Sequence, residues 1–227
     1  YTVSDGQGGE DTARVDVTVE ARSGDRHIAE TGTLTLTHTA QTLTLERSYD
    51  NPVVMAHVAT TNGMQPVNVR ISEVSGDELT LQLQEPNHLN GAHVDETVNY
   101  MVVEAGSWVL PDGSLLEAGT MDSDKLSSEG FETVAFDAEF DAAPAVLSQV
   151  QSFNGRDFVT TRQRGTDADS FQFTMQEEEA RNDGGHVTET LGWIAVEPGS
   201  GSIDGLEWRA GSTSGVTDAT ASVDLGA

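Results

Sequence analysis

The sequence contains no cysteine, and only one of its eleven basic residues, Lys125, is a lysine. Without cysteine the chain can form no disulfide, no thiolate zinc site and no cysteine nucleophile. No apolar run approaches the roughly 20 residues that a membrane helix needs, which argues against membrane insertion. The 38 acidic residues give a formal net charge of −27. A polyanion of this strength opposes contact with nucleic acid.

The acidic composition indicates the environment in which the protein works and not a binding partner. Proteins exposed to salty water often carry many carboxylates and little lysine, because bound cations offset the repulsion between the carboxylates. We therefore expect an extracellular, secreted or cell-surface protein from a marine or halophilic source. The 227 residues suffice for one large domain or two small ones.

An internal duplication dominates the chain. Many residues recur 92 positions later, and after one inserted residue the offset becomes 93. Chance does not produce this many matches in register. The matching positions include Pro52 and Pro144, Asn62-Gly63 and Asn154-Gly155, Arg70 and Arg162, His93 and His186, and Glu96 and Glu189.

Each repeat contains short runs in which apolar and polar residues alternate, as in Leu79, Leu81 and Leu83, and turn residues separate these runs. No segment has a helical period. The pattern predicts an all-β chain of two tandem antiparallel β-sandwich repeats of about 92 residues each. We place them at 30–120 and 121–212, and residues 213–227 form either a polar tail or the start of a third repeat.

Residues 1–20 predict a hairpin with a Gly-rich turn at Asp5–Gly9 and with Val15, Val17 and Val19 on one face. Their sequence resembles that of the C-terminal hairpin of bacterial cadherin-like, immunoglobulin-type repeats, which are stalk units of large secreted adhesins. Residues 21–29 then form a linker. Junctions in that family often bind calcium, so the resemblance implies calcium as a cofactor. The candidate ligands are Glu10, Asp11 and Glu20.

Each repeat also resembles the H-type lectin domain, a six-stranded antiparallel sandwich. The resemblance implies an extracellular module that binds glycans or polysaccharide, often as a trimer. It covers roughly 70 residues of each repeat. The residues that carry it are Tyr49–Val54, Arg70 and Tyr100 in the first repeat, and Phe140–Val146, Arg162 and Trp193 in the second.

A sharper motif runs from His93 through Glu96 and Tyr100 to Glu104, and it recurs from His186. On a strand the two Glu and the aromatic residue share one face. The ring could stack on a sugar between carboxylates, or it could be core while the carboxylates cap turns and pair with arginine. The candidate ligand-binding residues are Arg70, Glu85, His93, Glu96, Tyr100, Arg162, Glu177, His186, Glu189 and Trp193.

No catalytic pattern accompanies this motif. Glu96 and Glu104 lie about 27 Å apart along a strand, too far for a glycosidase pair, which needs about 5–10 Å. We expect no enzyme. The sequence predicts a non-catalytic, carbohydrate-binding adhesion module of a larger secreted repeat protein. The alternative is a structural repeat or filament subunit that assembles with copies of itself or neighbouring repeats by β-strand addition.

Overall fold

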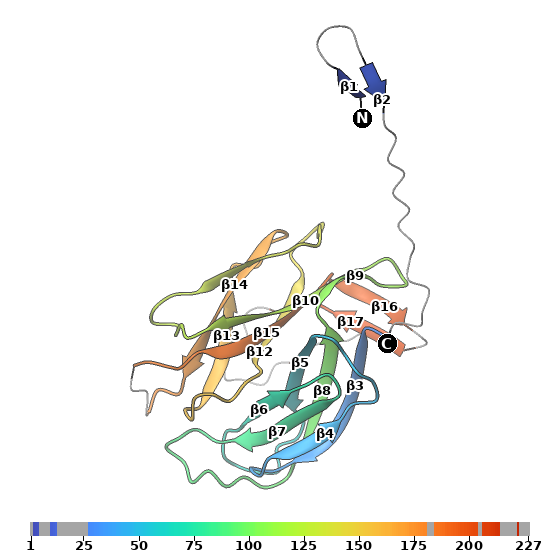
Figure 1. Ribbon diagram of the computed structural model, residues 1–227. Helices are drawn as coiled ribbons and strands as arrows, with labels where there is room; N and C mark the ends of the chain where they lie inside the picture. Colours follow the sequence, from blue (N-terminus) through green and yellow to red (C-terminus); the bar gives the residue numbers. More distant parts are fainter. Residues whose placement is uncertain are drawn as a thin grey trace.

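The computed structural model describes residues 2–4, 10–12, 27–180, 184–203, 206–213 and 222. These residues form antiparallel strands and no helix, which confirms the expected all-β class (Figure 1). None of the described residues forms a helix long and apolar enough to cross a membrane.

The first repeat packs two three-stranded sheets face to face. One sheet has the order β3-β8-β5 and the other the order β4-β7-β6. Inward residues alternate along the strands, so that Leu79, Leu81 and Leu83 of β7 are buried. The strands are β3 (Ala29–Leu36), β4 (Gln41–Thr44), β5 (Pro52–Val58), β6 (Asn68–Val74), β7 (Glu78–Gln84) and β8 (Glu96–Glu104).

The second repeat has the same strand order, which matches the duplication in the sequence. Its sheets are β12-β15-β10-β9 and β11-β14-β13. Its core is more aromatic, with Phe171, Phe173 and Trp193 buried. The strands are β9 (Gly106–Val109), β10 (Leu115–Ser123), β11 (Glu132–Ala135), β12 (Ala145–Val150), β13 (Val159–Arg164), β14 (Ser170–Glu177) and β15 (Glu189–Val196).

The chain passes between the repeats almost without a linker. Strand β8 ends at Glu104 and β9 begins at Gly106, whose φ of 129° only glycine adopts easily. Strand β9 then pairs with β10, the counterpart of β3, so the first strand of the second sandwich begins at Leu115. Strand β10 ends at Ser123 and therefore crosses the predicted boundary between the repeats at residue 120.

A second hairpin copies this connection. Strands β16 (Gly199–Ile203) and β17 (Leu206–Ala210) follow β15 as β9 and β10 follow β8. Gly106 pairs with Ala118 in the first hairpin, and Gly199 pairs with Ala210 in the second. Strand β17 therefore occupies the position of β10, the first strand of a sandwich.

A third apolar cluster lies between the two repeats. It combines buried residues of β5 and β8 with buried residues of β10 and β15, and Trp108 and Trp208 pack against it. The two sandwiches therefore share a core in addition to having one each. The buried members are Val53, Met55, Val103, Leu110, Leu116, Ala118 and Ile194.

The expected N-terminal hairpin is present in part. Strand β1 (Thr2–Ser4) pairs antiparallel with β2 (Glu10–Thr12), on either side of the Gly-rich segment. Val15, Val17, Val19 and residues 21–26 of the expected linker lie outside the described residues, as does nearly all of 213–227.

Candidate functional site

Each repeat holds a buried histidine between two glutamates. His93 Nδ1 lies 2.9 Å from Glu85 Oε1, and its Nε2 lies 3.2 Å from Glu96 Oε1. In the second repeat the corresponding distances from His186 to Glu177 and Glu189 are 2.8 and 3.2 Å. The structure thus brings together six of the ten residues expected to bind a ligand in two equivalent groups of three, and a seventh, Arg70, joins the second group.

The loop before each group closes over the second glutamate. Glu96 accepts hydrogen bonds from the Thr60 hydroxyl at 2.6 Å and from the backbone N–H groups of Asn62 and Gly63 at 2.8 and 2.7 Å. These donors stabilise the carboxylate, so they lower its pKa from 4.5 to about 2, against the opposing effect of burial.

Glycine is required where this loop crosses the histidine. A Cβ atom on Gly63 would lie 2.5 Å from His93 Cε1, and one on Gly155 would lie 2.6 Å from the same atom of His186. The repeated Asn-Gly pairs, which the sequence indicates as turns, therefore seat a loop directly on a histidine ring.

Glu189 receives the same donors and one more. Burial raises its pKa, but hydrogen bonds from His186, from the Ser152 hydroxyl and from the N–H groups of Asn154 and Gly155 outweigh this and lower it to about 2. The additional donor is Arg70, which reaches across from the first repeat.

Arg70 leaves β6 and enters the second repeat. Its Nη2 lies 2.5 Å from Glu189 Oε1 and 3.2 Å from the Gly155 carbonyl, and its Cζ lies 4.6 Å from the centre of the Phe153 ring. The residue is only 1% exposed. We name Phe153, Gly155 and Glu189 the arginine socket; its counterparts in the first repeat are Thr61, Gly63 and Glu96.

Arg162, the counterpart of Arg70, is in a different environment. It is exposed on β13, where its Nη1 donates to Gln176 Oε1 at 2.6 Å. Two arginines at the same position of the repeat thus have opposite burial. The difference arises because, among the residues that the structure describes, only the first repeat has another sandwich against this face.

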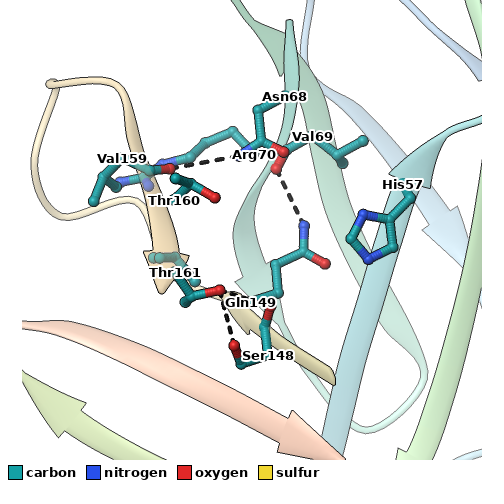
Figure 2. Close-up of a pocket in the computed structure, with 10 residues that line it drawn as sticks. His57, Asn68, Val69, Arg70, Ser148, Gln149, Val159, Thr160 and Thr161 are labelled. Carbon is teal, nitrogen blue, oxygen red and sulfur yellow. Dashed lines mark hydrogen bonds between the residues drawn. The ribbon is translucent and has the colours of Figure 1, made fainter. Parts of the chain in front are cut away.

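Gln149 of β12 and Gln151, which directly follows this strand, complete the contact between the repeats. Gln149 bonds both backbone groups of Ala56, while Gln151 accepts from the N–H of Val54 and donates to the Pro52 carbonyl. A polar cavity of about 30 Å³ lies beside Gln149, with His57 and Arg70 also in its wall (Figure 2). Ligand pockets are commonly about 300–1,000 Å³, so this cavity is far too small for a sugar ring.

The two motif aromatics lie in the sandwiches and not on an open face. Trp193 is 6% exposed, and its ring centre lies 5.6 Å from that of Phe171 and 6.0 Å from that of Phe136. Tyr100 is half-buried against the first core. Glu104 accepts from the N–H groups of Asp50 and Asn51, both at 2.8 Å. These positions match the interpretation of the motif as core and turn caps.

Sequence reasoning missed the partners of these residues. Tyr100 lies across from Gly32 and Trp193 across from Gly119, and a Cβ on either glycine would lie within 3 Å of the ring. It also missed Gln149 and Gln151. Two alternate glutamines at the end of a largely apolar strand would have been a usable signal, because buried amides require partners.

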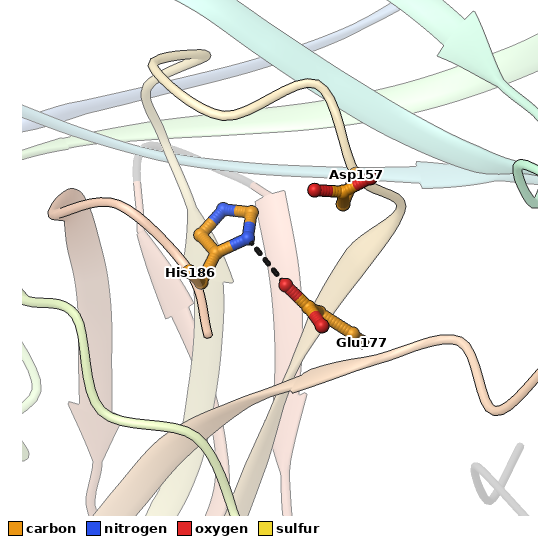
Figure 3. A group of neighbouring side chains, drawn as sticks. All are labelled: Asp157, Glu177 and His186. Carbon is orange, nitrogen blue, oxygen red and sulfur yellow. Dashed lines mark hydrogen bonds and ion pairs between the residues drawn. The ribbon is translucent and has the colours of Figure 1, made fainter. Parts of the chain in front are cut away.

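A group of possible metal ligands overlaps the second histidine. One ligand atom from each of Asp157, Glu177 and His186 lies within 4.8 Å of the others (Figure 3). However, each nitrogen of His186 already has a carboxylate partner, and the hydrogen bonds to Glu189 and Glu177 raise its pKa against the opposing effect of burial. An imidazole that donates to a carboxylate from both nitrogens has no lone pair for a metal. Among the expected calcium ligands, Glu10 and Asp11 lie in β2 and Glu20 lies outside the described residues.

The chain is similar to one large protein. It is 29% identical over 196 residues to Halomucin of Haloquadratum walsbyi (strain DSM 16790 / HBSQ001), and the match covers 82% of this chain but 2% of Halomucin. This chain therefore spans only a small fraction of the length of the curated relative that it matches. No family model matches the sequence. No solved structure matches it either.

Proposed function

We propose that this chain is a segment of an extracellular repeat protein in which the repeats act as structural units, locked to one another by an arginine and a socket. The observation that carries this proposal is the burial of Arg70 of one repeat in the Glu189 socket of the next. A buried ion pair fixes the relative position of its partners, because either charge left alone in the interior is costly.

The positions of the expected sugar-binding residues support this proposal. Trp193 lies in a core, Glu96 and Glu189 hold their own loops, and Arg70 is enclosed between repeats. A residue fully used in folding cannot also offer its polar atoms to a ligand. The contact differs from the β-strand addition considered above, because glutamine side chains cover the outer edge of β5.

The extracellular setting is proposed on two grounds. The acidic composition suits salty surroundings, where bound cations offset repulsion between carboxylates. The similarity to Halomucin gives the second ground, since its name describes a mucin. We propose the chain as non-catalytic, because its buried histidines and glutamates bond one another and not an open cleft.

Calorimetry tests whether the repeats are locked. We expect the two repeats to unfold in one transition, because they share an apolar cluster and the Arg70 contact. Arg70→Gln should separate this transition into two, whereas Arg162→Gln, the matched change on the exposed counterpart, should leave it single. Two independent transitions in the unchanged protein would refute the proposal.

Carbohydrate binding is the second candidate. An open depression of about 370 Å³ lies on the first repeat beside β7, large enough for a sugar. Its wall is rich in amides and other polar groups, which suit hydroxyls. Binding on a glycan array that Gln82→Ala abolishes and Gln41→Ala preserves would support it, and no retention of any glycan would count against it. The polar residues of the wall are His38, Gln82, Gln84, Glu85, Asn87 and Asn90.

A further inference from the structure

The contact between the two repeats runs in one direction only. Arg70 of the first repeat enters the socket of the second, but Arg162 of the second lies on the surface and not in the socket of the first. A two-fold interface would make both contacts, since each partner would present the same patch. The interface is therefore head-to-tail, and it leaves an arginine at one end of the repeat pair and a socket at the other.

The socket of the first repeat retains most of the features that hold Arg70. Glu96 is held by its loop in the same way as Glu189, and its only ion-pair partner among the described residues is His93. Beside it, Met64 is completely exposed. One feature is missing: Thr61 stands where Phe153 stacks on the guanidinium.

In several contacts at the existing interface the acceptor is a backbone carbonyl, which is present whatever the side chain at that position. Besides Arg70, Gln84 donates to the carbonyl of Arg156 and Asn68 to that of Val159. The equivalent carbonyls of the first repeat belong to Met64 and Val67. The equivalent donor positions in the second repeat are filled by Gln176 and Thr160, which can also donate.

The hairpin at the end of the second repeat copies the start of a sandwich. Strand β10 pairs with β9 on one edge and with β15, the central strand of its sandwich, on the other. Strand β17 stands in the position of β10 but, within the described part of the chain, pairs only with β16. In a second copy of this chain, β8 is already paired on both edges, with β3 and β5, so β17 supports continuation of the repeat along one chain and not the contact between two chains.

Building on the proposed structural function, we propose that the pair of repeats continues in both directions by the same contact. Arg162 enters the Gly and Glu socket of a following copy of the repeat, and the socket formed by Thr61, Gly63 and Glu96 receives the arginine of a preceding copy. When the 227-residue protein is studied alone, the occupant is a second copy of this chain.

Sedimentation measurements on the full chain test this. Repeats that are linked in one chain have effective concentrations of the order of millimolar relative to one another. The series of protein concentrations should therefore extend to about 1 mM. Salt of about 1 M shortens the screening length to about 3 Å and suppresses repulsion between two acidic copies. We expect the mass to rise with concentration, and Arg162→Gln to weaken association at least tenfold by removing the charged donor.

The matched control is Arg164→Gln. Arg164 lies two residues further along β13, is also exposed and also donates to a glutamine, Gln172. The Arg164→Gln variant therefore loses the same charge as Arg162→Gln. It should associate like the unchanged protein. Thr61→Phe supplies the missing ring and should tighten association about tenfold, the size of a well-placed cation–π contact.

Three results would overturn the proposal: a monomer throughout the series, an Arg162→Gln protein that associates normally, or equal losses from both arginine variants. Calorimetry on the same samples separates this failure from that of the structural function. A monomer with one unfolding transition refutes the continuation alone, whereas two independent transitions refute the locking of the repeats.

Discussion

The Gln149 side chain pairs with the backbone of Ala56 as a neighbouring strand would. Its Oε1 accepts from the Ala56 N–H at 2.6 Å, and its Nε2 donates to the Ala56 carbonyl at 3.1 Å. The outer edge of β5 is thereby satisfied by a side chain of the other repeat. An edge strand is normally open to pairing with other chains, so this contact both joins the repeats and closes the edge.

Replacing Gln149 by leucine should destabilise the protein by about 2–6 kcal/mol. Each buried backbone group left without a partner costs about 1–3 kcal/mol, and two groups of Ala56 would lose theirs. Denaturant unfolding measures the difference. The control is Gln163→Leu, which removes one hydrogen bond to the Val146 carbonyl from an exposed side chain. Equal losses from both variants would contradict the role assigned to Gln149.

Removing Arg70 should be far more costly than removing Arg162. Arg70→Met removes one of the two cations beside the buried Glu189 and breaks a buried ion pair, which typically costs about 3–5 kcal/mol, whereas Arg162→Met should cost less than about 1 kcal/mol. Because Nε and Nη1 of Arg70 are buried without a hydrogen-bond partner, the pair contributes more to position than to net stability. The double variant with Glu189→Gln should recover part of the loss, and strict additivity would show that the two residues are not coupled.

Stability should decline at both ends of the pH range. The pKa of Glu189 in the folded protein is about 2, below its ordinary 4.5, so its contribution is present above pH 4.5 and is lost as the pH falls towards 2. The pKa of His186 is raised above 6.5. Its contribution is therefore complete below pH 6.5 and is lost as the pH rises through the raised value.

Unfolding midpoints across pH check both limbs. Glu189→Gln should flatten the acid limb, and His186→Gln should cost most below pH 6.5 and progressively less above it. A cost of His186→Gln that stays the same from pH 5 to pH 9 would show that folding does not raise the pKa of the histidine.

Gly119→Ala should destabilise the second sandwich by about 1–3 kcal/mol, because its Cβ would lie 2.8 Å from Trp193 Cζ2. Trp193→Ala should cost about 3–5 kcal/mol by emptying the core. In the Trp193→Ala protein, adding Gly119→Ala should cost little, since the ring it meets is gone. The control is Gly185→Ala, which meets no atom within 4 Å. A large additional loss in the double variant would refute the contact.

Salt should stabilise the protein. The net charge of −27 makes the folded state repel itself, and the screening length falls from about 30 Å at 0.01 M to about 3 Å at 1 M. We expect the melting temperature to rise from low salt to molar salt, and to rise further with millimolar calcium. Sodium chloride and calcium should be titrated separately. A flat response to both would contradict both expectations, including that of ligands at Glu10, Asp11 and Glu20.

The fold was predictable because period-two patterns are local. Leu79, Leu81 and Leu83 show by their spacing alone that one face of a strand is buried, and the duplication made each prediction twice. The burial of Arg70 and the exposure of Arg162 were not predictable in this way. The two arginines occupy the same place in the repeat, and only the position of the neighbouring sandwich decides which is buried. The glycines facing Tyr100 and Trp193 depend on strand register, which a single sequence does not supply.

The near absence of a linker between β8 and β9 has a consequence for longer arrays. Because one residue, Ala105, separates the two strands, the backbone itself fixes the orientation of each sandwich relative to the previous one. Small fixed rotations then add from repeat to repeat, as they do in solenoids. A long array of such units would behave as a stiff, regularly twisted rod with a constant pitch, and not as beads on a flexible string.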